Sequence, residues 1–195
     1  MIRVGVIGLG EVSQCMHLPI LQNLWETYTI AAVSDVSPSL VSFIQKEYNV
    51  KEGYGDALEM IEQADIDAVL ILSPDQYHGE YVKRALKAGR HVFVEKPVTL
   101  CLRELNELIE LKKQYPDHIV MVGCMRRYAG PYLKAKEILE STPMKTEYLR
   151  FRDIILEAPF FLRQTRRLFY PKDVPAEVIQ EGGRRRRAQL DEAIG

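Results

Sequence analysis

The sequence of 195 residues has few cysteines and no long apolar run. Its three cysteines, Cys15, Cys101 and Cys124, are widely spaced and form neither a CxxC pair nor a Cys/His cluster. The sequence therefore predicts no metal site and no disulfide framework. No apolar stretch approaches the roughly 20 residues that a membrane helix needs, and the first residues, MIRVGVIGLGEV, lack the pattern of a signal peptide. We expect a cytoplasmic protein without a membrane partner.

The sequence also lacks a charge excess of either sign. Its 26 Lys and Arg residues against 27 Asp and Glu residues leave a formal net charge of −1, so no overall field favours nucleic acid. With 47% hydrophobic and 27% charged residues, the composition is typical of a folded globular protein. A small molecule is the expected partner, and nucleic acid is not.

Short apolar runs alternate with stretches of helical period through the first 122 residues. The runs are nearly continuous in Val, Ile, Leu and Ala, which is typical of strands buried on both faces of a parallel sheet. We predict strands at residues 2–7, 29–34, 67–72, 91–94 and 118–122, and helices at residues 11–24, 38–48, 56–63, 77–88 and 99–114. This order predicts an α/β fold with a doubly wound parallel sheet of the Rossmann type.

The rhythm changes after residue 122. A helix is expected over residues 130–140 and a strand over residues 147–156. We interpret residues 1–122 as a whole cofactor domain and residues 123–195 as the incomplete start of a second α/β domain. The strand would present an edge for pairing with another chain, which predicts a homo-oligomer formed through the second domain.

The chain ends in a basic run and a helix-like segment. Arg184 to Arg187 are interpreted as a solvated helix face, or as a segment that packs on residues absent from the chain, in preference to a phosphate or nucleic-acid site. The last residues, DEAIG, stop inside a predicted helix without a stop signal. This ending favours a piece of a longer protein.

A glycine-rich turn follows the first predicted strand and opens the first predicted helix. Its residues, Gly8-Leu9-Gly10-Glu11-Val12-Ser13, lie where a GxGxxG/A dinucleotide-binding turn is expected. Gly8 would allow the tight turn, Gly10 would let the backbone approach a pyrophosphate, and the small Ser13 would keep the helix close to the sheet. The helix start would attract the phosphate charge.

Asp35 ends the second predicted strand, 22 residues after Ser13. An acid at this place binds the adenosine ribose hydroxyls of a dinucleotide. The alternative is a helix-start acid before Ser37 and Pro38. An acid here would repel a 2′-phosphate, and the segment VSDVSPS offers no arginine to hold one, so the sequence favours NAD over NADP.

Two further polar segments follow later predicted strands. Residues 73–78, SPDQYH, follow one strand, and Glu95-Lys96-Pro97 follows the next. Ligands of open α/β sheets bind at these carboxyl ends. The ammonium of Lys96 can bind a hydroxyl or carbonyl oxygen and serve as an acid or base, although a surface ion pair at a turn is the alternative.

Four segments together resemble one known family. They are GVIGLGEVSQCMHLPIL, YGDALEM, SPDQYHGEYVKRALKAGRHVFVEKPV and GCMRRY, and they resemble the Gfo/Idh/MocA family, which includes glucose-fructose oxidoreductase and inositol 2-dehydrogenase. The resemblance covers residues 1 to about 140. It implies an N-terminal Rossmann domain, a C-terminal α/β domain, and hydride transfer between NAD(P) and a sugar, polyol or related carbonyl compound.

The resemblance also implies roles for particular residues. Lys96 would be catalytic and would meet both nicotinamide and substrate, with Met125 and Arg126 also approaching the substrate, and its bond to Pro97 would be cis. Asp75 stands where the family more often has asparagine, and a carboxylate there costs desolvation unless it is paired. The residues that would line the cofactor are Gly8, Gly10, Val12, Ser13, Asp35, Ser73, Pro74, His78, Glu95 and Lys96.

The chain lacks one motif of that family, a later aspartate and histidine in a D-x-G-x-H context. Three interpretations stay open. The chain is a piece of a hydride-transferring dehydrogenase, a noncatalytic nucleotide-binding regulatory or partner protein, or an enzyme completed by a second polypeptide. The ending of the chain favours the first.

Overall fold

A six-stranded parallel sheet forms the centre of the molecule. The computed structural model describes residues 1–142, 145, 147, 148, 150, 152 and 168–194. The strands lie in the order β3-β2-β1-β4-β5-β6, and each neighbouring pair is parallel. The strands are β1 (Ile2–Ile7), β2 (Tyr28–Ser34), β3 (Glu52–Tyr54), β4 (Ala68–Ile71), β5 (His91–Val94) and β6 (Val120–Val122). This order confirms the predicted doubly wound fold.

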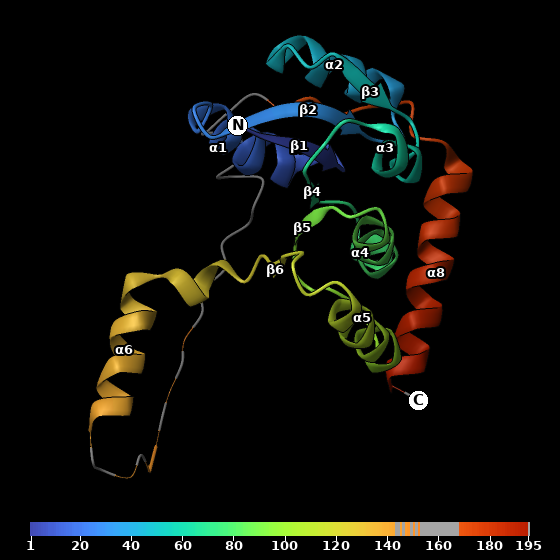
Figure 1. Ribbon diagram of the computed structural model, residues 1–195. Coiled ribbons are helices and arrows are strands. Elements are labelled where there is room, and N and C mark those ends of the chain that lie inside the picture. The colour runs from blue at the N-terminus through green and yellow to red at the C-terminus, as the bar shows by residue number, and fades with distance from the viewer. Residues whose placement is uncertain (143–144, 146, 149, 151, 153–167, 195) are drawn as a thin grey trace.

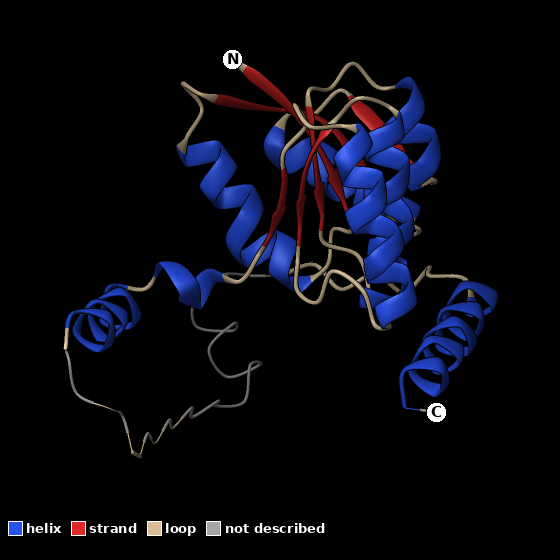
Figure 2. Ribbon diagram, turned by 60° about the horizontal axis from the view of Figure 1, so that its bottom comes forward, coloured by secondary structure: helices blue, strands red, loops and turns tan. Residues whose placement is uncertain are grey.

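Helices cover the sheet on both faces (Figures 1 and 2). They are η1 (Ser13–His17), α1 (Leu18–Asn23), α2 (Pro38–Tyr48), α3 (Ala57–Gln63), η2 (Asp75–Tyr77), α4 (His78–Lys87), α5 (Leu102–Gln114), η3 (Met125–Tyr128), α6 (Gly130–Ser141) and α8 (Ala176–Ile194). The predicted start of α2 is confirmed, because the Ser37 hydroxyl accepts a hydrogen bond from the Leu40 N–H at 3.1 Å and Pro38 occupies the first turn.

The core consists of two apolar layers, one on each face of the sheet. One layer joins the strands to α3, α4 and α5, and the other joins them to α1 and α2. Within β1, Val4 and Val6 belong to the second layer while Ile7 belongs to the first. Because both faces are covered, the central strands can be apolar at successive positions, which explains the continuous runs in the sequence.

The sequence missed one short strand and a local irregularity within one helix. Strand β3 was not predicted, because a three-residue edge strand that pairs only with β2 buries little surface and its sequence, Glu-Gly-Tyr, has no apolar run. The helix predicted at residues 11–24 is confirmed as one continuous helical run over residues 11–23, within which the π-helical turn η1 precedes α1. Most of the strand predicted at residues 147–156 lies outside the described residues.

Residues 168–194, here called the return segment, pack back onto the sheet and its covering helices, here called the sheet unit (residues 1–122). The Phe169 ring stacks on Phe43 with centroids 4.8 Å apart. The Gln14 amide donates to the Phe169 carbonyl at 3.0 Å and accepts from its N–H at 2.9 Å. In Figure 1, α8 runs beside α4 and α5, whereas α6 stands apart from the sheet. The return segment therefore forms part of the surface of the sheet unit.

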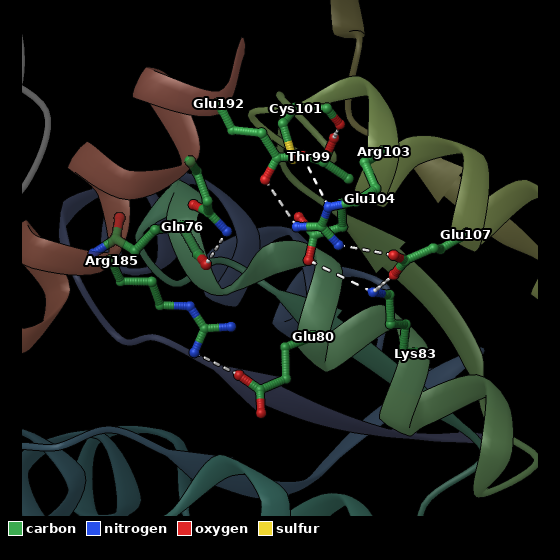
Figure 3. A network of polar contacts seen from close by, with 11 residues as sticks. Gln76, Glu80, Lys83, Thr99, Cys101, Arg103, Glu104, Glu107, Arg185 and Glu192 are labelled. Carbon is green, nitrogen blue, oxygen red and sulfur yellow. Dashed lines mark hydrogen bonds and ion pairs between the residues drawn. The ribbon is translucent and has the colours of Figure 1, made fainter. Parts of the chain in front are cut away.

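Ion pairs fasten α8 along this surface (Figure 3). Arg185 pairs with Glu80 of α4 at 2.7 Å, and Arg103 of α5 pairs with Glu192 at 2.8 Å. The interpretation of Arg184 to Arg187 as a solvated face is therefore wrong for Arg185, whose guanidinium also lies 4.9 Å from the centre of the Tyr77 ring. Exposed pairs contribute little individually, but α8 also packs closely at Gly182, against Gln76 and Tyr77.

Within the described ranges, no helix combines the length and apolar character needed to cross a membrane. The same part of the chain contains no group of three or more His, Cys, Asp or Glu side chains arranged to hold a metal ion.

Gly182 and Gly183 offer a matched test of α8 docking. A Cβ at Gly182 would lie 2.9 Å from Nε2 of Gln76 and 3.3 Å from the Tyr77 hydroxyl, whereas a Cβ at Gly183 would meet nothing within 4 Å. Gly182→Leu is expected to speed tryptic cleavage within Arg184 to Arg187 by roughly tenfold, because overpacking costs about 1–3 kcal/mol. Gly183→Leu carries the same change in helix propensity and should leave the cleavage rate unchanged. Equal rates in the two variants would contradict this account of docking.

Candidate functional site

The glycine turn lies at the carboxyl ends of β1 and β4. The Gly8 N–H donates to the Ser34 carbonyl at 2.9 Å, and Gly8 has φ +82°. A Cβ at this residue would lie 2.6 Å from the backbone nitrogen of Ser73, so the turn requires glycine at this position. A Cβ at Gly10 would meet nothing within 4 Å. The fold thus requires Gly8, while Gly10 leaves an open backbone surface for a ligand.

The last two residues of the predicted turn differ in exposure. Val12 is 43% exposed, whereas Ser13 is 1% exposed. The buried Ser13 hydroxyl has no hydrogen-bond partner among the described residues, so its contribution is small size beneath the helix start rather than a polar contact.

Asp35 connects the glycine turn to the start of α2. Its Oδ2 accepts from the Leu9 N–H at 2.8 Å, and its Oδ1 accepts from the Ser37 N–H at 3.0 Å. The contact with Ser37 fits the interpretation as a helix-start acid. Each carboxylate oxygen has a further lone pair, and Asp35 also lines a cavity, so it can accept donors from a ligand as well.

A cavity of about 490 Å³, here called the Asp35 cavity, opens beside that carboxylate. Its size lies in the range of small-molecule sites. The sheet unit and the return segment both form its walls. The lining residues include Gly8, Ser34, Asp35, Val36, Ser73, Pro74, Gln76, Tyr77 and Tyr81 from the sheet unit, and Val174, Val178, Ile179 and Gly182 from the return segment.

A second cavity of about 440 Å³, here called the Lys96 cavity, lies on the other side of the Ser73-Pro74 loop. Ser73, Pro74 and Gln76 line both cavities. The Lys96 cavity brings together six residues that the sequence predicted for the cofactor. They are Val12, Ser73, Pro74, His78, Glu95 and Lys96.

His78 holds together the two loops that shape the Lys96 cavity. The ring is 2% exposed. Its Nδ1 lies 2.7 Å from the Pro97 carbonyl oxygen, and its Nε2 lies 2.7 Å from the Ser73 carbonyl oxygen. Both ring nitrogens therefore face backbone oxygens, and His78 positions the loops. The bond between Lys96 and Pro97 is cis, as the resemblance implied.

The Glu95 carboxylate has a partner that the sequence did not indicate. Its Oε1 lies 3.0 Å from Nε2 of His17, and its Oε2 accepts from the Lys96 N–H at 3.2 Å. His17 also lies against Phe93, with ring centroids 5.2 Å apart. The separation of 78 residues between the partners leaves no local sequence signal for this pair.

Asp75 has a charged partner in α8. The Arg186 Nε and a terminal guanidinium nitrogen lie 3.1 and 3.3 Å from the two Asp75 oxygens. This pair offsets the desolvation cost expected for the carboxylate. Because a guanidinium does not give up its proton in proteins, α8 brings a fixed positive charge to the Lys96 cavity. Sequence reasoning missed this role of Arg186.

Met125 and Arg126, predicted near the substrate, lie on η3 after β6. Met125 is 64% exposed. Neither residue is part of the lining of the two cavities. The structure therefore gathers the predicted cofactor residues at the carboxyl edge of the sheet. Met125 and Arg126 follow β6 at this edge but line neither cavity.

A glycine turn on the first strand, an acid at the end of the second and a groove on both sides of the β4 loop define a dinucleotide-binding α/β protein. Residues 2–124 match the model of the oxidoreductase family with an NAD-binding Rossmann fold. The chain belongs to this Gfo/Idh/MocA family.

Several characterised proteins are similar to this chain. Myo-inositol 2-dehydrogenase of Thermotoga maritima is 35% identical over 139 residues, which are 71% of this chain and 41% of that protein. Scyllo-inositol dehydrogenase of Lactobacillus casei, solved with NAD(H) and scyllo-inositol, has a TM-score of 0.68 and 31% identity over 72% of this chain and 41% of its own. A 3-ketoreductase variant of Actinomadura kijaniata, solved with NADP, has a TM-score of 0.64 and 25% identity over 71% and 42%. The chain spans about two fifths of these relatives.

Alanine at the two turn glycines should separate folding from cofactor binding. Gly8→Ala is expected to lower the free energy of unfolding by roughly 2–4 kcal/mol, because its Cβ would meet the Ser73 backbone in a left-handed conformation. Gly10→Ala should leave the melting temperature nearly unchanged and weaken dinucleotide binding at least tenfold. Thermal unfolding and calorimetric titration measure the two effects. Unchanged affinity in Gly10→Ala would remove the pyrophosphate from this turn.

Proposed function

We propose that the chain binds NAD and forms the cofactor-binding part of a dehydrogenase acting on a sugar, polyol or related carbonyl compound. One observation carries the proposal: the glycine turn borders both cavities, since Gly8 lines the Asp35 cavity and Val12 lines the Lys96 cavity. A dinucleotide laid across the turn would place its adenosine at Asp35 and its nicotinamide toward Lys96.

The preference for NAD is supported by the carboxylate of Asp35. In this proposal its remaining lone pairs accept the ribose hydroxyls, whereas a 2′-phosphate would meet a like charge. The relatives alone leave the choice open, because one was solved with NAD(H) and another with NADP.

Lys96 is the proposed catalytic residue. It is exposed at the edge of its cavity, where its ammonium can donate a hydrogen bond to a substrate oxygen. Bound NAD supplies the hydride acceptor. When the substrate is oxidised, Lys96 would have to be the neutral amine and would take the hydroxyl proton while the substrate carbon gives up its hydride; in the reverse reaction the ammonium would return that proton to the carbonyl oxygen. Met125 and Arg126 remain proposed substrate contacts. The names of the relatives support a polyol or sugar substrate.

Noncatalytic nucleotide binding is the second candidate function. Arg186 of α8 favours this candidate. It lines the Lys96 cavity and its guanidinium keeps its proton, so it cannot serve there as an acid or base. A regulatory protein could use the same groove to sense the cofactor.

The domain organisation, the pairing of copies and the cellular compartment belong to the same proposal. Residues 1–122 would be the cofactor domain and residues 123–195 the beginning of a second one, in a protein of the length of its relatives. Pairing of copies through residues 147–156 remains a prediction. The three cysteines are free thiols, which supports a reducing compartment such as the cytoplasm.

Calorimetric titration with NAD and NADP tests the cofactor proposal. The chain is expected to bind NAD more tightly than NADP, and Asp35→Arg should reverse the ratio of the two dissociation constants by at least tenfold, because it replaces a repelling carboxylate by a phosphate-binding guanidinium. Asp117→Arg makes the same charge change at an exposed turn and should leave the ratio unchanged. No NAD binding at millimolar cofactor would refute the proposed function.

The rate of NADH formation tests the proposed catalytic role of Lys96. With a panel of polyols and aldoses, NADH formation is expected to fall at least about 100-fold in Lys96→Ala, the scale of a lost acid or base, while the dissociation constant for NAD changes less than threefold. Lys87→Ala, at the exposed end of α4, is the control. Turnover that survives in Lys96→Ala would exclude it as the catalytic residue.

A further inference from the structure

The return segment places a carboxylate at the start of α2. Oδ1 of Asp173 accepts from the Ser37 hydroxyl at 2.5 Å and from the Ser39 hydroxyl at 2.7 Å, and its Oδ2 accepts from the Ser39 N–H at 2.9 Å. These donors belong to the first turn of an 11-residue helix. An internal anion thus occupies polar groups that a helix start otherwise offers to phosphate or another acid.

Asp173 and Asp35 lie on two sides of the same serine. The Ser37 N–H donates to Asp35 at 3.0 Å, while the Ser37 hydroxyl donates to Asp173. Val174, the next residue after Asp173, lines the Asp35 cavity. The second carboxylate is therefore at the margin of the proposed adenosine site.

Asp173 is charged under all ordinary conditions. The hydrogen bonds from Ser37 and Ser39 lower the pKa of its carboxyl to about 2. Protonation would therefore not relieve its repulsion of an anion at neutral pH.

A 2′-phosphate of NADP would have to lie close to Asp173 at the start of α2. If the adenosine ribose is hydrogen-bonded to Asp35, a phosphate on its 2′-oxygen would lie near the start of α2, because Asp35 itself contacts Ser37 there. Ser37 caps α2 and Ser39 lies in its first turn, and their hydroxyls would otherwise suit a phosphate. In this chain both hydroxyls already donate to Asp173.

We propose that Asp173 is a second determinant of cofactor choice, which excludes the 2′-phosphate of NADP by occupying its donors and by charge repulsion. The inference rests on the proposed binding of NAD with its ribose at Asp35. It assigns to the return segment a role in selecting the cofactor, in addition to closing the cavity. A purely structural role would make Asp173 only an anchor between this segment and α2.

Asp173→Asn separates the two roles, because asparagine keeps the shape and an acceptor oxygen but removes the charge. The ratio of the NADP to the NAD dissociation constant is expected to fall roughly three- to tenfold, the range for one exposed charge acting on a phosphate in water. Affinity for NAD should change less than twofold. The effect should shrink at high salt, because ions screen the charge.

Two further variants complete the experiment. Asp191→Asn makes the same charge change at an exposed position near the end of α8 and should leave the ratio unchanged. Asp173→Glu keeps the charge but alters the fit, so the ratio should stay near that of the unmodified chain. Tryptic cleavage within Arg184 to Arg187 reports whether each variant keeps α8 docked.

The outcomes separate this inference from the proposed function. If the unmodified chain binds neither dinucleotide, the proposed function fails and this inference fails with it. If the chain binds NAD but Asp173→Asn leaves the ratio unchanged, only the inference is overturned. An equal change of the ratio in Asp173→Asn and Asp173→Glu would likewise overturn it, because anchoring rather than charge would then explain the selectivity.

Discussion

The close approach of the glycine turn to the end of β4 is the constraint on which the rest of the site depends. Gly8 lies so near the Leu72 and Ser73 backbone that a Cβ would be 2.6 to 2.7 Å from it. This contact fixes where β1 and β4 diverge, which is the crevice that open α/β sheets use for ligands. The Asp35 carboxylate secures the turn from the other side through the Leu9 N–H. The two cavities follow as the spaces on either side of the loop that begins at Ser73.

Groups far apart in sequence maintain this arrangement. His78 bridges the Ser73 and Pro97 carbonyls, so the loops after β4 and β5 are held as a unit. The return segment adds a wall to the Asp35 cavity through Val174 and Gly182. Because a buried ring and a closely packed glycine tolerate little displacement, the groove is shaped before any ligand enters it.

Local patterns in the sequence predicted much of the fold but little of the contact network. Continuous apolar runs identified the buried strands, since both faces of the sheet are covered, whereas β3 has too little buried surface to leave such a run. The glycine turn was readable because its chemistry is contained in six neighbouring residues. The pairs of Asp75 with Arg186 and of Ser37 with Asp173 join residues 111 and 136 positions apart. Such pairs depend on tertiary packing. The distant partner of Arg186 leaves no local signal in the sequence, and the run Arg184 to Arg187 is therefore interpreted from sequence as a solvated face.

The return segment reaches both the Asp35 cavity and the Lys96 cavity. Asp173, just before α8, lies at the proposed adenosine end, and Arg186, within α8, lines the Lys96 cavity. The docking contact at Gly182 lies between them, against Gln76 and Tyr77. Because Gln76 borders both cavities, a shift of α8 would alter both together. Under our proposals, the charge that opposes a 2′-phosphate and the charge that neutralises Asp75 both come from the return segment. Cofactor choice and the electrostatics around Lys96 would then both depend on the docking of this segment.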